Sequence, residues 1–182
     1  MITRGDYLKA QRASADLILK TGISIHPNEM GRIEVADFGL SQLQIFGAQI
    51  LTLVDTEKIA AKLIAMQPYQ IMPEHWHPQV GDYVGKEETI RCEWGILLLY
   101  SPGEPAPAPK AVVPESRRSS FTNWHERIIL PAEQVTLPPN TAHWFQAGPE
   151  GVVVWSFSTK VIDLQDQFTD PDIRRETVIS ED

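Results

Sequence analysis

The segment QIMPEHWHP (Gln70–Pro78) indicates a β-strand that ends in two histidines. Side chains two residues apart on an extended strand project from the same face, so His75 and His77 can reach one metal ion. A His-x-His pair is a weak signal by itself, because exposed histidines also produce it by chance. The pair alone therefore leaves a metal site and two ordinary histidines about equally open.

Short β-rich runs separated by turn residues continue on both sides of this segment, and no long helical pattern lies between them. Such a series predicts an antiparallel sandwich or barrel. The predicted strands are 46–54, 58–66, 70–77, 88–100, 125–130, 134–137, 143–147 and 151–159. Before them, apolar residues recur at helical spacing between Thr3 and Lys20, which predicts a short N-terminal helix. The fold class is therefore all-β with a short N-terminal helix.

Composition and charge narrow the possible functions. The 182 residues are about what one domain needs, and the net charge of −8 argues against nucleic acid as a partner. No apolar run is long enough for a membrane span, so we expect a cytoplasmic protein with no membrane partner. The single cysteine, Cys92, cannot form an intramolecular disulfide. Any metal site must therefore use histidine and carboxylate ligands.

Two adjacent glutamates compete for the role of a third ligand. Glu88 has the same strand parity as the apolar residues Ile90 and Cys92, whereas Glu87 has the opposite parity. The apolar set faces the interior of a barrel, so we expect Glu88 to point inward. A buried carboxylate needs a partner that offsets its desolvation, and a divalent ion would serve.

A fourth candidate ligand follows the proline-rich turn PPNTAH, which ends at His143. The turn would deliver this imidazole from a rigid point at the start of a strand, although a partly exposed strand-end histidine is the alternative. Three imidazoles and one carboxylate leave two positions open on a six-coordinate ion, and they suit Mn(II), Fe(II), Co(II), Ni(II) or Zn(II). We expect His26 on the surface and His125 in a structural hydrogen bond.

These residues resemble the two motifs of the cupin superfamily, namely His75-Trp-His77 with a later glutamate and Pro-x-x-x-His143 followed by Trp-Phe. The eleven-residue gap from His77 to Glu88 is similar to that of the D-lyxose ketol-isomerase group of sugar isomerases. The similarity extends over residues 37–172. It implies a cupin barrel (double-stranded β-helix or jelly roll) at 37–172, an N-terminal helix and arm at 1–36, and a polar C-terminal tail at 173–182. We expect a short helix followed by disorder after Asp163.

The resemblance implies a metal-dependent aldose–ketose isomerase that converts a small free sugar, such as D-lyxose or D-mannose, through an enediol. The ion would be Mn(II), and its ligands would be His75, His77, Glu88 and His143. Lys86 would act in catalysis by steadying the enediolate, unless it is a surface lysine beside a turn. Trp76 and Trp144 would contact the sugar, although barrel tryptophans are more often core. Fold analogy further implies a homodimer.

One position departs from the family pattern. We expect a glutamate immediately before the Phe-Ser-Thr segment at 157–159, where this chain has Ser156. Ser156 would face the cavity and contact substrate, but it cannot transfer a proton at neutral pH as a carboxylate can. A non-catalytic or repurposed cupin that binds a sugar or small acid therefore stays open as the alternative. A third hypothesis, a dioxygenase that uses Fe(II), is disfavoured by the long gap in sequence between His77 and Glu88.

Overall fold

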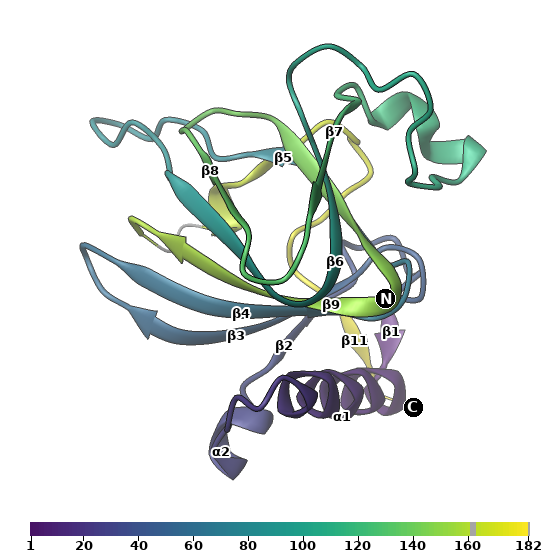
Figure 1. Cartoon of the computed structure of the whole chain (residues 1–182). Coiled ribbons are helices and arrows are strands. Elements are labelled where there is room, and N and C mark those ends of the chain that lie inside the picture. The colour runs from purple at the N-terminus through teal and green to yellow at the C-terminus, as the bar shows by residue number, and fades with distance from the viewer. Residues whose placement is uncertain (161–162, 182) are drawn as a thin grey trace.

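Strands are the main secondary structure of the computed structural model, which describes residues 1–160 and 163–181 (Figure 1). The strands are β1 (Ile2–Thr3), β2 (Glu34–Ala36), β3 (Ala48–Asp55), β4 (Ala60–Met66), β5 (Ile71–Trp76), β6 (Glu88–Ser101), β7 (His125–Ile129), β8 (Gln134–Leu137), β9 (His143–Ser158), β10 (Gln167–Phe168) and β11 (Ile179–Ser180). Strands β2 to β10 form one antiparallel sheet that curls into a barrel, and β1 pairs with β11 separately. The predicted all-β fold is confirmed.

The predicted N-terminal helix is also confirmed, as α1 (Arg4–Lys20). Thr3 caps it by accepting a hydrogen bond from the backbone N–H of Asp6, whose negative charge also suits the first turn. The helix lies outside the barrel (Figure 1), where its apolar face packs on the outer side of the sheet. The shorter helices are α2 (Pro27–Met30), η1 (Glu115–Ser120) and η2 (Asp163–Gln165). Within the described residues, no helix combines the length and apolar character that a membrane crossing needs.

The two longest strands, β6 and β9, pair along almost their whole length and bend together. The bend falls at Gly95 and Gly151, both of which have positive φ, and a Cβ at Gly95 would lie 2.2 Å from the carbonyl oxygen of Gly151. Only glycine fits such a close approach of two backbones. The predicted strands 143–147 and 151–159 are therefore the two arms of one bent strand. The bend brings the two ends of the β6–β9 pair close together inside the barrel.

The C-terminal tail is more ordered than we expected, which corrects the prediction of disorder after a short helix. Strand β10 pairs with β5, and β11 pairs with β1, which directly precedes α1. Ile173 is buried in the main core cluster. The tail thus returns to the barrel and covers the strand that carries His75.

Candidate metal centre

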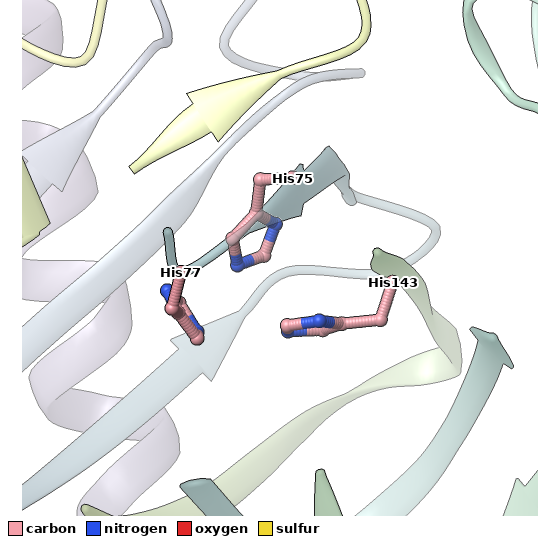
Figure 2. Close-up of side chains that lie close together, drawn as sticks. All are labelled: His75, His77 and His143. Carbon is pink, nitrogen blue, oxygen red and sulfur yellow. The ribbon is translucent and has the colours of Figure 1, made fainter. Parts of the chain in front are cut away.

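Three imidazoles converge inside the barrel, where Figure 2 shows them pointing toward a common space. One nitrogen from each of His75, His77 and His143 lies within 4.8 Å of the other two. His75 is on β5 and is the cross-strand partner of His143 at the start of β9, while His77 directly follows β5. All three side chains are buried. The structure therefore brings together the three histidines that the sequence singled out.

The Nδ1 atom of each ring contacts an oxygen acceptor. These acceptors are the carbonyl of Pro73 for His75 at 2.8 Å, Oδ1 of Asp166 for His77 at 2.7 Å, and the carbonyl of Thr141 for His143 at 2.8 Å. An oxygen acceptor at Nδ1 places the proton there and leaves the Nε2 lone pair free to bind a metal. Nε2 of His143 is buried and has no hydrogen-bond partner among the described residues.

Glu88, the fourth predicted ligand, lies beside the histidines at the start of β6. Its Oε2 lies 3.0 Å from Nε2 of His77 and 3.9 Å from Nε2 of His143, and its side chain is buried while Glu87 is exposed. The strand-parity prediction that selected Glu88 over Glu87 is confirmed. Ser156 on β9 donates a hydrogen bond from its hydroxyl to Oε1 of Glu88.

Burial and neighbouring charges set the protonation of the cluster. Burial, together with the other two imidazoles, holds the pKa of His75 well below its usual value, and burial beside His77 lowers the pKa of His143 to about 4. Burial would also lower the pKa of His77, but its hydrogen bonds to Asp166 and Glu88 outweigh that effect and raise it. Two of the three imidazoles are therefore neutral at pH 7, as metal ligands must be.

A network of buried charges lies beside the histidines. Nζ of Lys86 lies 3.4 Å from Oε1 of Glu88 and 3.5 Å from Oδ1 of Asp163. Asp163 also pairs with Lys62 on β4 and with Arg175 in the tail. Burial would lower the pKa of Lys86, but the adjacent carboxylates raise it, so this lysine stays protonated. Burial would likewise raise the pKa of Asp163, but Lys86, Lys62 and Arg175 hold it well below its usual range.

Together with His75, these groups line a small cavity beside the histidine cluster. Its wall is charged on one side and apolar on the other, where Ile50, Ile64, Met72 and Phe145 lie. The charged side offers Lys62, Lys86, Glu88, Asp163, Asp166 and Arg175. A small polar molecule that enters here meets hydrogen-bonding groups and the histidines at once.

The two tryptophans predicted to contact substrate lie elsewhere, which is a correction. Trp144 is fully buried on the opposite face of β9 from His143, stacks on Tyr100 at 4.0 Å between ring centroids, and donates its indole N–H to the carbonyl of Asn123. Trp76 alternates with His75 and His77 and so projects from the other face of the strand. Because side chains alternate between the two faces of a strand, a tryptophan next to a ligand histidine points away from the metal centre.

The remaining two histidines behave as predicted. His26 is exposed and caps α2 through its side chain. Nδ1 of His125, at the start of β7, contacts the carbonyl of Glu104 at 2.9 Å. Neither belongs to the cluster.

Sequence reasoning missed four charged residues of the cavity, namely Lys62, Asp163, Asp166 and Arg175. Lys62 carried a usable signal, because it shares strand parity with Ile64 and Met66 and a lysine in that phase points inward. The other three lie in the tail, and Asp166 meets His77 across 89 positions of sequence. No local pattern marks such a contact.

The residues present fit a divalent ion. Three imidazoles with one carboxylate beside them form a mixed nitrogen and oxygen donor set that first-row divalent metals accept. The orphaned Nε2 of His143 supports this assignment, because a buried ring nitrogen without a partner is costly unless something binds it.

Comparison with known proteins places the chain in a family, although no family model matches it. It is 48% identical to the D-lyxose ketol-isomerase of Thermofilum sp. (strain ex4484_79) over 175 residues, which cover 96% of this chain and 97% of that one. It is 45% identical to the D-lyxose ketol-isomerase of Cohnella laeviribosi over 177 residues, which cover 97% of each chain.

Solved structures show the same fold at much lower identity. The L-ribose isomerase of Cellulomonas parahominis superposes with a TM-score of 0.82 at 16% identity. That of Acinetobacter sp. DL28, solved in complex with L-ribose, gives 0.83 at 16% identity. Both alignments cover 98% of each chain. With near-complete coverage at 45–48% identity, this chain belongs to the D-lyxose ketol-isomerase family of sugar isomerases.

Proposed function

We propose that the protein is a metal-dependent aldose–ketose isomerase that acts on a small free sugar such as D-lyxose or D-mannose. The observation that carries the proposal is the convergence of three buried imidazoles, with Glu88 3.0 Å from Nε2 of His77, beside a cavity whose wall holds Lys86 and Asp163. The names of the relatives agree with it, and one from Thermosediminibacter oceani, 42% identical over 175 residues, is a D-lyxose/D-mannose isomerase.

His75, His77, Glu88 and His143 would hold the ion, and we propose Mn(II). A bound divalent ion polarises the carbonyl and adjacent hydroxyl oxygens of a sugar, which acidifies the C–H bond between them. The protein's own contribution is to keep the Nε2 atoms aimed at one point, through acceptors that fix each ring.

Lys86 would stabilise the negative charge that develops on the enediolate. Its ammonium group is buried and protonated, so it acts in a medium where a charge interaction is stronger than in water. Lys62 lies on the same charged wall and can hydrogen-bond a further hydroxyl of the sugar. The two lysines therefore serve the transition state and substrate orientation, respectively.

Asp163 is our candidate for the group that moves the proton between C1 and C2. It lines the cavity, it is ionised, and its buried Oδ1 has no hydrogen-bond partner among the described residues. Lys86 lies 3.5 Å from that oxygen, so a sugar that separates the two groups would raise the basicity of the carboxylate. Ser156 needs no proton-transfer role in this scheme, because it binds Glu88.

Incubation of the Mn(II)-loaded protein with D-lyxose or D-mannose in D₂O tests the proposal. Proton transfer by a base places solvent deuterium at the carbon that gains the proton, and NMR detects both the ketose and the label. Asp163→Asn should abolish turnover while the protein still binds Mn(II). Binding of sugar with no ketose would favour the non-catalytic alternative, and ketose without deuterium would rule out exchange through Asp163.

We also propose a homodimer. Val112, Ile128 and Leu130 leave apolar surface exposed around β7, which pairs only with β6 within the described sheet. A second copy that covers this edge would bury that surface. Light scattering on a size-exclusion column gives the mass directly, and a monomer would count against the proposal.

A further inference from the structure

The tail segment 163–175 contacts β5, β4 and the turn before β6, all of which lie beside the metal centre. Strand β10 pairs with β5 at His75 and Trp76, and the ring of Phe168 lies 5.8 Å from that of His75. Asp166 reaches His77, and Asp163 reaches the lysines of β4 and of the turn before β6. The segment therefore forms one wall of the site.

Polar contacts dominate the docking of this segment. Ile173 is buried and Phe168 is half-buried, but Leu164 is 70% exposed. The remaining anchors are hydrogen bonds and ion pairs, such as those from the backbone and hydroxyl of Thr169 to Glu74. Segments with few apolar contacts open locally at a modest free-energy cost. The stability of this wall thus depends on groups at the metal centre.

Asp166 joins the segment to a ligand directly. Its carboxylate lies 2.7 Å from Nδ1 of His77, and both side chains are at least 96% buried. An acceptor in this position fixes the ring, keeps its proton on Nδ1 and increases the electron density at Nε2. When the segment undocks, His77 loses all three effects.

We propose that Asp166 is a positioning residue that couples docking of the 163–175 segment to metal binding at the histidine cluster. The inference rests on the proposed metal site and deepens it. Coupling between two equilibria is reciprocal, so the factor by which the docked segment strengthens metal binding equals the factor by which metal stabilises docking. The substrate cavity and the metal site therefore form together.

Two measurements on the full chain test this proposal, with MnCl₂ as the only added ligand. Calorimetry gives the affinity for Mn(II), and hydrogen exchange follows the amides of Thr169 and Arg174, which bond to Glu74 and Phe38 when the segment is docked. We expect Mn(II) to slow both amides in the wild type. Asp166→Ala should weaken Mn(II) binding by about 10- to 100-fold and remove that slowing.

Asp166→Asn serves as the conservative variant, because its amide oxygen can still accept a hydrogen bond from Nδ1 of His77. Its affinity for Mn(II) should fall between those of the wild type and Asp166→Ala. Gln165→Ala, an exposed side chain of the same segment, should match the wild type. Wild-type affinity in both Asp166 variants, or equal slowing of exchange by Mn(II) in Asp166→Ala, would overturn the inference alone. A wild-type protein that binds no Mn(II) would overturn the proposed function as well.

Discussion

Ser156 donates a hydrogen bond to Glu88, and both side chains are buried in the barrel. The serine therefore holds the carboxylate that we assign to the metal. Where a catalytic glutamate was expected, the chain has an orienting hydroxyl, and two carboxylates of the tail, Asp163 and Asp166, line the cavity.

Substitutions at position 156 should act through Glu88. Ser156→Ala removes one hydrogen bond to a buried carboxylate, and we expect it to lower the free energy of unfolding by about 1.5–3 kcal/mol. Ser156→Glu places a second buried carboxylate against Glu88, so it should lose both stability and Mn(II) affinity and gain no isomerase activity. Chemical unfolding and calorimetry check both, with Ser158→Ala as the matched control. Higher turnover in Ser156→Glu would contradict this account.

Lys86→Met should separate catalysis from metal binding. Loss of a buried cation beside the enediolate should reduce kcat by about 100-fold or more, whereas the histidine ligands remain. The variant should also lose about 3–5 kcal/mol of stability, because Glu88 and Asp163 stay buried without their shared partner. Steady-state kinetics and unfolding curves give the two values, and Lys160→Met, a more exposed lysine paired with Glu57, is the control. A kcat close to wild type would remove Lys86 from the mechanism.

Metal binding should release a proton near neutral pH. His77 has a raised pKa, so at pH 6.5 it is more than half protonated, and its Nε2 must lose that proton before it binds a metal. The neighbouring imidazoles are already neutral. Calorimetry of MnCl₂ binding in two buffers of different ionisation enthalpy should give a proton release that grows as the pH falls below the pKa of His77 and vanishes at high pH. A release close to zero at every pH would show that His77 is not a ligand.

The metal-free protein should lose stability as the pH falls below about 6.5. His75 and His143 protonate near 6.5 when unfolded but only at much lower pH when folded, about 4 for His143. In that window the unfolded state binds more protons, so each histidine costs about 1.4 kcal/mol per pH unit. His77 acts in the opposite sense, because its raised pKa adds stability that is lost as the pH rises through the folded value. Urea unfolding from pH 4 to 8 should therefore show a maximum near neutrality.

His143→Gln supplies the check on that pH dependence. The substitution removes one of the two histidines that lower stability in acid. The free energy of unfolding should therefore decline less steeply between pH 6.5 and 4. An unchanged slope would mean that His143 is not held neutral by burial.

Glu74→Gln should loosen the loop that precedes β7. The Glu74 carboxylate is buried and accepts hydrogen bonds from Thr122, Asn123 and Thr169, and it forms no ion pair within residues 1–160 and 163–181. An amide nitrogen in place of one oxygen would face those donors, which should cost about 1–3 kcal/mol. Faster proteolysis within the loop at 102–124 would report the change, and the exposed Glu87→Gln is its control. Unchanged proteolysis and stability would contradict this role.

Much of the site could be predicted because strand parity is a local property. The two-residue repeat of a strand paired His75 with His77 and selected Glu88, and both results depend only on nearby residues. The same rule, applied to Trp76 and Trp144, would have placed them on the strand faces opposite the histidines. Local periodicity also located β3 to β9, except that β9 continues through a bend that was predicted as a turn. The short strands β1, β2, β10 and β11 were not predicted.

The rest depends on contacts that no local pattern encodes. Asp163, Asp166 and Arg175 reach the cavity only because the tail pairs with β5 and returns to the barrel. In sequence they belong to a polar stretch with no apolar repeat, which is also the composition of a disordered end. Their roles follow from long-range charge pairing with Lys62 and Lys86, which cannot be predicted from local sequence patterns.

The position of the tail in the chain has a consequence for biosynthesis. A ribosome makes all four proposed ligands, from His75 to His143, before it makes Asp166. The growing chain therefore carries every proposed ligand before it carries the carboxylate that fixes the His77 ring. Full metal retention becomes a late event of synthesis, so that a prematurely terminated chain would keep the barrel's strands without a competent site.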